Sequence, residues 1–393
     1  MRFYSVWRQE PLSGGNGNSV GTGALMEKWW KRVTWVGMIL ALAALLSALW
    51  AGLLRLGWPW PAWQPALPAW HGPLMVSGFL GTLIGLERAV ALRRGWSFAG
   101  PWLTGLGGLV LLAGGPARVG IALLTLGSLG FVAVSLVIWR RERAVHTATM
   151  AVGALVWAAA NGLWLAGRPI SQLSLWWAAF LLLIIAGERL ELGRVLRPTR
   201  RVVRGFGALV GGLTAGLLAG LVAPEIGWRL ASLSVLGLGV WFGRNDLARR
   251  TIRKSGLTRY IAFNLLLGYG WLSLSGFIGL VAGNVQAGLL YDAWLHSLFV
   301  GFVFSLIFAH ALLILPALTG VSLTYRPRFY APTMLLHAGL LLRIVSDLAG
   351  WRTGRQWGGL LNVAAILLFA GLVITGAGRR ASVSGDAPPR SQP

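Results

Sequence analysis

The sequence contains no cysteine, and only 11 of its 393 residues are acidic. Without thiolates the chain has no ligands for an iron–sulfur cluster, no attachment point for a c-type haem and no disulfide. A bound metal must therefore take its ligands from histidine, methionine, carboxylates or the backbone. The sequence also lacks a G-x-x-x-x-G-K-[ST] phosphate loop, a nucleophile elbow and an H-E-x-x-H motif, so the machinery of an ATP-driven pump or a common hydrolase is missing.

Apolar residues dominate the chain instead. Hydrophobic residues make up 56% of it and charged residues 12%, which is typical of a polytopic membrane protein. The sequence predicts an all-α, polytopic transmembrane helical bundle of about 12 spans. Apolar runs long enough to cross a bilayer occupy residues 33–57, 71–92, 99–115, 119–139, 147–166, 172–193, 203–222, 227–243, 257–282, 288–317, 330–350 and 356–377. The third run is rich in glycine and carries the weakest signal.

The formal net charge is +24, and the distribution of the basic residues along the chain is typical of a membrane protein and not of a nucleic-acid-binding protein. Arginines cluster in alternate loops, as at Arg140, Arg141 and Arg143, and membrane insertion keeps such loops in the cytoplasm. We therefore expect both termini inside and lipid, not nucleic acid, as the surrounding partner. The predicted organisation is a polar cytoplasmic tail at 1–30, a single twelve-span membrane domain at 31–380 and a disordered cytoplasmic tail at 381–393.

The histidines are the candidate functional residues, because a polar side chain at membrane depth is costly unless it is paired or liganded. Four of the five lie in apolar runs, and their depths predict two pairs: His71 with His296 near the outer face, and His310 with His337 near the inner face. In an α-helix, the 14 residues from His296 to His310 place both imidazoles on one face, about 21 Å apart. For the fifth histidine, His146, we favour a hydrogen bond at the interface.

Imidazoles on facing helices are the usual axial ligands of a non-covalent haem. The two pairs therefore predict one or two b-type haems, with the histidines as the metal ligands. Asp292 lies one helical turn before His296 and is a candidate to accept the free ring N–H of that histidine. Asp292 and Tyr291 are equally expected to mark the water interface. The alternative for the histidines is a simple hydrogen bond to a neighbouring helix.

A resemblance supports the haem hypothesis. The segment Trp70–Thr82, WHGPLMVSGFLGT, resembles the H-x-x-x-M-x-x-G-F pattern of the NnrS family, and His296–His310 is similar to the later histidine-bearing span of that family. His71-Gly72 followed by Met75 is more distantly similar to the second helix of haem-copper oxidase subunit I. The NnrS family consists of twelve-span bacterial membrane proteins that contain haem and copper and are linked to nitric oxide stress.

The resemblance implies a protein of the bacterial cytoplasmic membrane that binds haem, with copper as a second metal. It further implies Met75 beside the His71 ligand, a diatomic gas such as nitric oxide as a ligand, and a respiratory redox partner. A complete haem-copper oxidase centre needs six histidines, and this chain has five. An oxidase or nitric oxide reductase of that pattern is therefore not expected, and whether the protein is an enzyme stays open.

Buried charges form a second set of candidates. Glu87–Arg88 and Glu188–Arg189, followed by Glu191, lie in the similar contexts IGLERAV and IAGERLEL, which hint at an internal repeat. Such residues most often tie helices together or extend to the interface. Two functional roles are the alternatives: the three glutamates could form a proton path, or Arg88 and Arg189 could bind the propionates of a haem.

The second and eleventh runs contain two further features, a charged pair and a glycine stripe. Arg343 and Asp347 are spaced for a pair within one helix, and Arg343 is a further candidate to bind the cofactor. Gly78, Gly81 and Gly85 form a stripe that admits a neighbouring helix or a flat cofactor.

Three functions are consistent with these features. The first is a haem-bearing redox protein that handles electrons or a diatomic gas. The second is a secondary transporter or channel, for which twelve spans are common and whose path the buried Glu, Asp and Arg groups would line. The third is an assembly factor for a respiratory oxidase.

Overall fold

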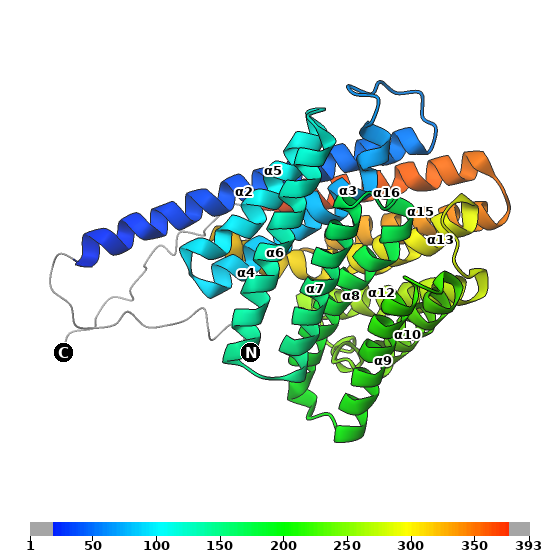
Figure 1. The fold of residues 1–393 in the computed structure, drawn as a ribbon. Helices are drawn as coiled ribbons and strands as arrows, with labels where there is room; N and C mark the ends of the chain where they lie inside the picture. Colours follow the sequence, from blue (N-terminus) through cyan, green and yellow to red (C-terminus); the bar gives the residue numbers. More distant parts are fainter. Residues whose placement is uncertain (1–18, 377–393) are drawn as a thin grey trace, which may run out of the picture.

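The computed structural model describes residues 19–376, with side chains from residue 30 onward, and in this range the chain is helical with no β-strand (Figure 1). The tail predicted at 381–393 and the first 18 residues of the tail predicted at 1–30 lie outside the described range. The elements are α2 (Ser19–Arg55), η1 (Leu67–Trp70), α3 (His71–Pro73), η2 (Leu74–Gly81), α4 (Thr82–Leu92), η3 (Gly95–Phe98), α5 (Ala99–Leu112), α6 (Ala117–Arg141), α7 (Val145–Leu165), α8 (Ile170–Gly193), η4 (Arg194–Leu196), α9 (Arg200–Ala219), α10 (Pro224–Asn245), α11 (Ala248–Thr251), α12 (Gly256–Ala282), α13 (Gly288–His296), η5 (Ser297–Phe304), α14 (Ser305–Thr319), η6 (Pro327–Phe329), α15 (Tyr330–Leu348) and α16 (Arg352–Gly376). The predicted all-α bundle is confirmed.

Eleven of the predicted runs coincide with helices that are long and apolar enough to cross a membrane. The chain is therefore a multi-pass membrane protein. The span ends agree with the predicted ones to within four residues. The agreement has a simple cause, because a segment in lipid must satisfy its backbone internally and so stays helical as long as it stays apolar. The α2 helix itself begins earlier, at Ser19.

The remaining run, 99–115, forms α5, a helix of only 14 residues. Its N-terminal end lies level with the start of the first span, because the Phe98 and Trp30 ring centroids are 4.9 Å apart. Its C-terminal end reaches the loop after α2, where the Gln64 side chain donates to the Leu111 carbonyl at 2.6 Å. With η3 in front of it, α5 therefore runs most of the length of its neighbours.

The number of crossings is even. The last helix, α16, begins where α2 ends, because the Gln356 side chain donates to the Leu56 carbonyl at 2.9 Å and Trp357 packs edge-on against Trp58. The two helices run antiparallel, so the first and last spans have their chain ends at the same end of the bundle (Figure 1). Eleven long spans and the shorter α5 give this parity, as the sequence predicts. Below, the end where α2 meets α16 is called the predicted outer end.

Three spans form the centre of the bundle. In the segments Leu67–Leu92, Ile170–Leu196 and Gly288–Thr319, 72%, 78% and 72% of the residues in the most apolar stretch are buried, against 22–61% in the other long spans. With α5 counted, these are the second, sixth and tenth spans, so every fourth span is central. The similar Glu–Arg sequences predicted as a sign of repetition lie in the first two of them.

Asparagines hold helices together, as is usual where no water can satisfy a buried polar group. The Asn161 side chain accepts the indole N–H of Trp177 at 3.1 Å, and Asn264 accepts the hydroxyl of Thr333 at 3.1 Å. Asn362 donates to the Leu336 carbonyl at 2.8 Å. These bonds join α7 to α8, α12 to α15 and α15 to α16.

Candidate functional site

The structure brings His71 and His296 together. His71 opens α3 and His296 closes α13, so the pair joins two of the three central spans near the predicted outer end. Their ring centroids are 6.4 Å apart and their planes are inclined by 20°. The pairing by depth that the sequence predicted therefore holds for these two residues.

Each of these imidazoles is held by its Nδ1 atom. Nδ1 of His71 lies 2.7 Å from the Ala48 carbonyl oxygen, and Nδ1 of His296 lies 2.9 Å from the Asp292 carbonyl oxygen. A carbonyl oxygen only accepts, so Nδ1 carries the proton in both rings. Among the described residues neither Nε2 has a hydrogen bond, so both lone pairs are available to a ligand.

Both histidines line one cavity of about 320 Å³ between α2, α3, η2, α8, α13, η5, α15 and α16. This is within the usual range for a small-molecule site. Much of the wall is apolar, from residues such as Leu49, Phe299 and Val300. Met75, the methionine of the H-x-x-x-M pattern, also lines the cavity.

Charged groups gather at the same cavity. Asp292 accepts from Nε and Nη2 of Arg343, both at 2.8 Å, and its Oδ1 atom is 3.3 Å from Nδ1 of His296. Asp292 therefore stands beside His296 as predicted. The prediction of an Arg343–Asp347 pair was wrong, because the carboxylate partner of Arg343 comes from α13. Asp347 instead lies 3.9 Å from Arg355, a weaker contact.

Local backbone geometry places the two histidines. Each is followed by an eight-residue π-helix, η2 after α3 and η5 directly after His296, and every residue of both segments is buried. Single π-turns inside α-helices are frequent at functional sites. The π-helix at η5 also breaks the α-helical phase, so the argument that His296 and His310 share a helix face was wrong.

Gly52 of α2 makes room for the His71 ring. A Cβ atom at this position would lie 2.8 Å from Cε1 and 2.9 Å from Nδ1 of His71. Only glycine lets the imidazole reach the Ala48 carbonyl without displacement. The sequence analysis did not single out Gly52, because the contact joins residues that are 19 positions apart in the chain.

His337 has a different environment. The Trp271 indole N–H donates to its Nδ1 at 2.9 Å, so the ring proton is on Nε2, which faces the Ser305 hydroxyl at 3.5 Å. Both ring nitrogens are used by neighbouring side chains. His337 is a hydrogen-bonded core residue in this arrangement.

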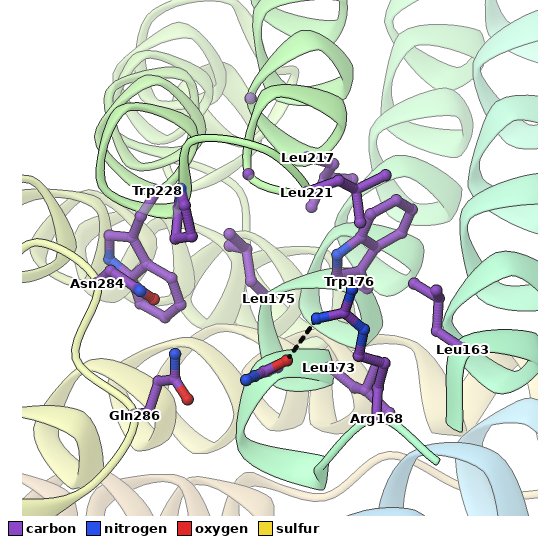
Figure 2. Close-up of a pocket in the computed structure, with 14 residues that line it drawn as sticks. Leu163, Arg168, Leu173, Leu175, Trp176, Leu217, Leu221, Trp228, Asn284 and Gln286 are labelled. Carbon is purple, nitrogen blue, oxygen red and sulfur yellow. Dashed lines mark hydrogen bonds between the residues drawn. The ribbon is translucent and has the colours of Figure 1, made fainter. Parts of the chain in front are cut away.

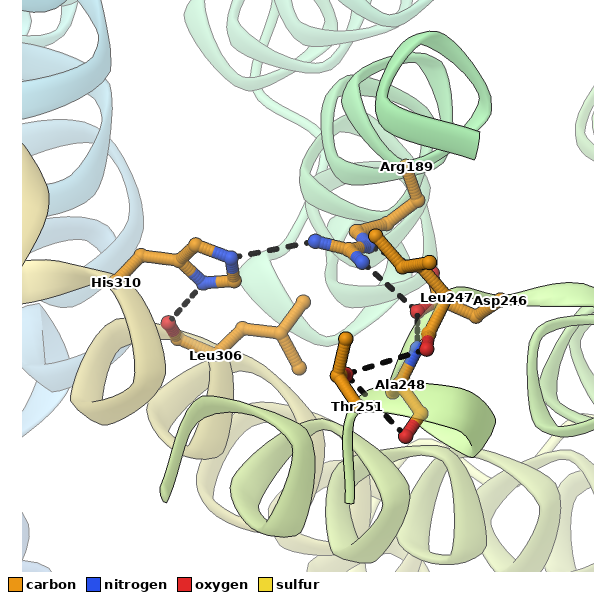
Figure 3. Close-up of polar contacts among 7 residues, drawn as sticks. All are labelled: Arg189, Asp246, Leu247, Ala248, Thr251, Leu306 and His310. Carbon is orange, nitrogen blue, oxygen red and sulfur yellow. Dashed lines mark hydrogen bonds and ion pairs between the residues drawn. The ribbon is translucent and has the colours of Figure 1, made fainter. Parts of the chain in front are cut away.

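His310 also has two partners, which Figure 3 shows. Its Nδ1 lies 2.9 Å from the Leu306 carbonyl oxygen, and its Nε2 accepts from Nη1 of Arg189 at 3.3 Å. The remaining guanidinium nitrogens of Arg189 donate to Asp246, at 2.8 Å each. The partners of His310 and His337 are thus separate, and no interaction joins the predicted inner pair in the described part of the chain.

Asp246 is the residue that the sequence analysis missed. Its side chain is only 1% exposed, and it also accepts the Ala248 backbone N–H at 2.7 Å. A signal was present, because an aspartate between Arg244 and Arg249 in a chain with 11 acidic residues is unusual. A buried arginine with a bidentate carboxylate is a structural pair in the first instance.

The two predicted Glu–Arg sequences meet each other and tie two central spans together. Arg88 of α4 donates to Glu188 of α8, and Glu87 and Glu191 are near enough to act on the Arg88 charge. Of the three arginines predicted to bind a cofactor, Arg343 alone lines the cavity of His71 and His296. The hypothesis paired Arg88 and Arg189 with haem propionates. In the structure their partners are the carboxylates of Glu188 and Asp246.

The glycine stripe packs against helices. A Cβ at Gly81 would overlap the Trp157 ring, and one at Gly85 would lie 3.2 Å from Pro101. A Cβ at Gly78 would lie 3.1 Å from Ala44. Close helix packing therefore accounts for the stripe, as the plainer of the two alternatives expected.

The described residues contain no group of three or more His, Asp or Glu side chains that could hold a metal ion. A metal centre built from those protein ligands alone is thus not formed between residues 30 and 376. A haem needs only axial ligands from the protein, because the porphyrin supplies the other four nitrogens. The pair of His71 and His296 meets that smaller requirement.

A neighbouring cavity of about 130 Å³, between α7 and α8 on one side and α9 and α10 on the other, has a different lining. Figure 2 shows Trp176 and Trp228 on its walls. Nη1 of Arg168 donates to the side-chain oxygen of Gln172 at 3.4 Å. No histidine or carboxylate is among the described residues that line it. The described lining therefore offers no imidazole or carboxylate that could bind a metal ion or transfer a proton.

Comparison with known proteins gives a family but no activity. Residues 32–377 match the model of a family described as a domain of unknown function, DUF8744. No curated protein matches the chain. The family description names neither a cofactor nor a reaction, so any function rests on the site.

Proposed function

The chain belongs to the DUF8744 family, and we propose that it is a haem-binding integral membrane redox protein in which His71 and His296 are the axial ligands of one b-type haem. The observation that carries the proposal is the pair of nearly parallel imidazoles at one cavity, each with its proton fixed at Nδ1 by a backbone carbonyl. Neutral imidazole with a free Nε2 lone pair is the form that binds metal. The hydrogen bonds therefore select the ligand tautomer before any metal arrives.

The spacing of the rings also supports the proposal. Metal–imidazole bonds are about 2 Å long, so two rings on opposite sides of one ion have centroids about 6 Å apart. The observed separation is 6.4 Å. Because the histidines come from the second and tenth spans, the site depends on the assembled bundle.

The surrounding residues fit the remaining needs of a haem. Phe299 and Val300 offer apolar contact to a macrocycle, and Arg55 and Arg355 line the same cavity without a close carboxylate bond. Two propionates require such cations when they are removed from water. The Arg343–Asp292 pair fixes the helical turn that holds His296, since Asp292 belongs to both contacts.

The chemistry that a haem supplies here is one-electron exchange at its iron. His71 and His296 would both be ligands of the iron, so no coordination position would be left for a gas. We therefore favour electron transfer over binding of nitric oxide or another diatomic gas, because a gas would have to displace His71 or His296. In this proposal the protein exchanges electrons with a respiratory partner in the bacterial cytoplasmic membrane.

Copper is the second candidate metal at the same place. Met75 lines the cavity together with His71 and His296, and thioether and imidazole ligands suit copper(I). A copper site would use the same two histidines without filling the apolar part of the cavity. Metal analysis distinguishes the two, because only haem brings iron and a Soret band.

The test is the visible spectrum of the protein purified from cells supplied with haem. We expect a Soret band and an α-band on reduction, both lost in His71→Ala and in His296→Ala. His310→Ala is the matched control, because it removes an imidazole of the same tautomer that lies outside the cavity. It should keep the full spectrum.

Other outcomes reject the proposal in distinct ways. A wild-type protein with neither iron nor copper above background would leave the transporter hypothesis as the stronger one. A full Soret band in His71→Ala would mean that the haem is bound elsewhere. Retention of copper without a Soret band, lost in both cavity variants, would replace haem by copper at the same residues.

A further inference from the structure

A second cavity, at the opposite end of the bundle from His71, is built from arginine. It has a volume of about 560 Å³ and lies where the ends of α8, η4, α9, α10 and α11 meet. Six arginines line it: Arg189, Arg197, Arg244, Arg249, Arg250 and Arg253. This end of the bundle is the predicted cytoplasmic face.

The positive charge of this cavity has one counter-ion. Asp246 is the only carboxylate among its described lining residues. Both of its oxygens are occupied, since they accept from Arg189 and from the Ala248 backbone N–H. Asp246 therefore neutralises the buried arginine at the back of the cavity and has little capacity left for the others.

The remaining five arginines have no carboxylate partner in the described part of the chain. Their guanidinium groups are exposed at the rim, and Arg249 is steadied by a bond to the Arg244 carbonyl at 3.0 Å. Five unpaired cations around one concave space repel one another. An anion that bridges them would relieve the repulsion.

The backbone adds to the positive electrostatic potential of this cavity. Arg197 has a φ of 49°, in the left-handed region that favours glycine. The turn leads into α9, a 20-residue helix whose first turn contains no acidic residue and whose Thr199 cap also lines the cavity. The positive end of a helix dipole without a carboxylate nearby favours an anion.

We propose that this cavity binds a phosphate group. Planar guanidinium groups match the oxygens of phosphate bidentately, which makes arginine the preferred residue for this anion. Leu190, Leu196 and Trp241 give the cavity an apolar side as well. A phospholipid headgroup and a soluble phosphate share the chemistry that the arginines recognise, and basic pockets between spans on the cytoplasmic side are typical headgroup sites.

The site is distinct from the proposed haem site. No residue lines both cavities, and the phosphate proposal does not depend on haem. Figure 3 shows the connection to the bundle centre: the Arg189 side chain lies between Asp246 at the cavity and His310 of the tenth span.

The experiment measures thermal unfolding of the full-length protein in maltoside detergent micelles, which contain no phosphate, because a ligand that binds the folded state raises the unfolding temperature. One arm adds phosphatidylglycerol to the micelles. The second arm adds no lipid and titrates inorganic phosphate and pyrophosphate. We expect a rise with phosphatidylglycerol if the source is lipid, and a rise with phosphate or pyrophosphate if it is soluble.

Two double variants locate the effect. Arg244→Gln with Arg250→Gln removes two rim cations of the cavity, and Arg326→Gln with Arg328→Gln removes two exposed arginines from the loop between α14 and α15, which is also predicted to be cytoplasmic. The first should weaken binding by about tenfold or more, because each cation near the surface contributes several-fold to affinity. The second should bind like the wild type.

Two results overturn the proposal. One is an unfolding temperature that none of the anions raises. The other is an equal loss in both double variants, which would show that the anion responds to the general surface charge and not to the cavity.

Discussion

The two ends of the bundle use the same residue types for different purposes. At the predicted outer end, His71 and His296 keep one ring nitrogen free, because backbone carbonyls take only the Nδ1 proton. At the other end, Arg189 takes the lone pair of His310. Four intramembrane histidines therefore divide by their hydrogen-bond partners, and not by their depth alone.

The arginines differ in the same way. Arg343 is paired with Asp292 beside a candidate ligand, whereas Arg189 is paired with Asp246 and closes the back of a basic cavity. Both are bidentate pairs between different helices. A buried ion pair by itself therefore indicates that two helices are held together. A binding site is indicated when a free ring lone pair or an unpaired charge lies next to that ion pair.

The largest effect that tests this comparison is expected from Asp246→Ala. The substitution leaves Arg189 buried, at 6% side-chain exposure, without its carboxylate. Removing one partner of a buried pair typically costs about 3–5 kcal/mol of unfolding free energy. Unfolding in detergent measures the loss, and the spectrum of the fraction that stays folded should not change.

The control for Asp246→Ala removes both charges. Arg189→Met with Asp246→Leu should recover most of the stability, because apolar side chains of similar volume often replace a buried pair without loss. If Asp246→Ala unfolds like the wild type, the pair does not hold this end of the bundle. If it abolishes the visible spectrum of the folded fraction, the two ends are not independent.

An intermediate effect is expected from Gly52→Ala. The new methyl group would lie under 3 Å from the His71 ring and must displace it, at a cost of about 1–3 kcal/mol for an overpacked site. At the proposed haem site, the occupancy measured in the purified protein should fall with the stability. Gly270→Ala is the control, because nothing lies within 4 Å of its Cβ; equal haem content in both variants would remove Gly52 from the site.

The smallest effect is expected from Arg194→Gln. Arg194 pairs with Glu142 at 2.8 Å, but the two side chains are 59% and 50% exposed. Exposed pairs contribute less than about 1 kcal/mol. If the unfolding free energy of Arg194→Gln stays within about 1 kcal/mol of the wild type, the exposed pair contributes much less than the buried Arg189–Asp246 pair. A larger loss would show that solvent exposure does not determine how much an ion pair stabilises this protein.

Most of the fold could be predicted from the sequence, because the bilayer makes hydrophobic length decisive. Run 257–282 became α12, Gly256–Ala282, almost without change. The Gly-rich run 99–115 gave the short α5, since glycine weakens a helix and its small size lets neighbours approach. The π-helices after His71 and His296 had no signal in the hydrophobic pattern, because a π-helix and an α-helix in a fully buried span are equally apolar.

The candidate site was predicted in part. Depth along the spans was sufficient to pair His71 with His296, since both lie near the same end of long helices. Depth was not sufficient for His310 and His337, whose partners, Arg189 and Trp271, come from helices far away in the sequence. The same limit explains why Arg343 was assigned to Asp347, its neighbour in the helix, and not to Asp292.

The sequence by itself determined that this protein crosses a membrane many times, which end carries the positive charge, and how deep each histidine lies, because hydropathy and arginine position act locally along the chain. Only the tertiary structure decided which side chains meet. Which side chains contact each other depends on how the helices are rotated and packed. A π-helical turn or a single glycine changes both the rotation and the packing, and neither change can be recognised from the amino-acid composition.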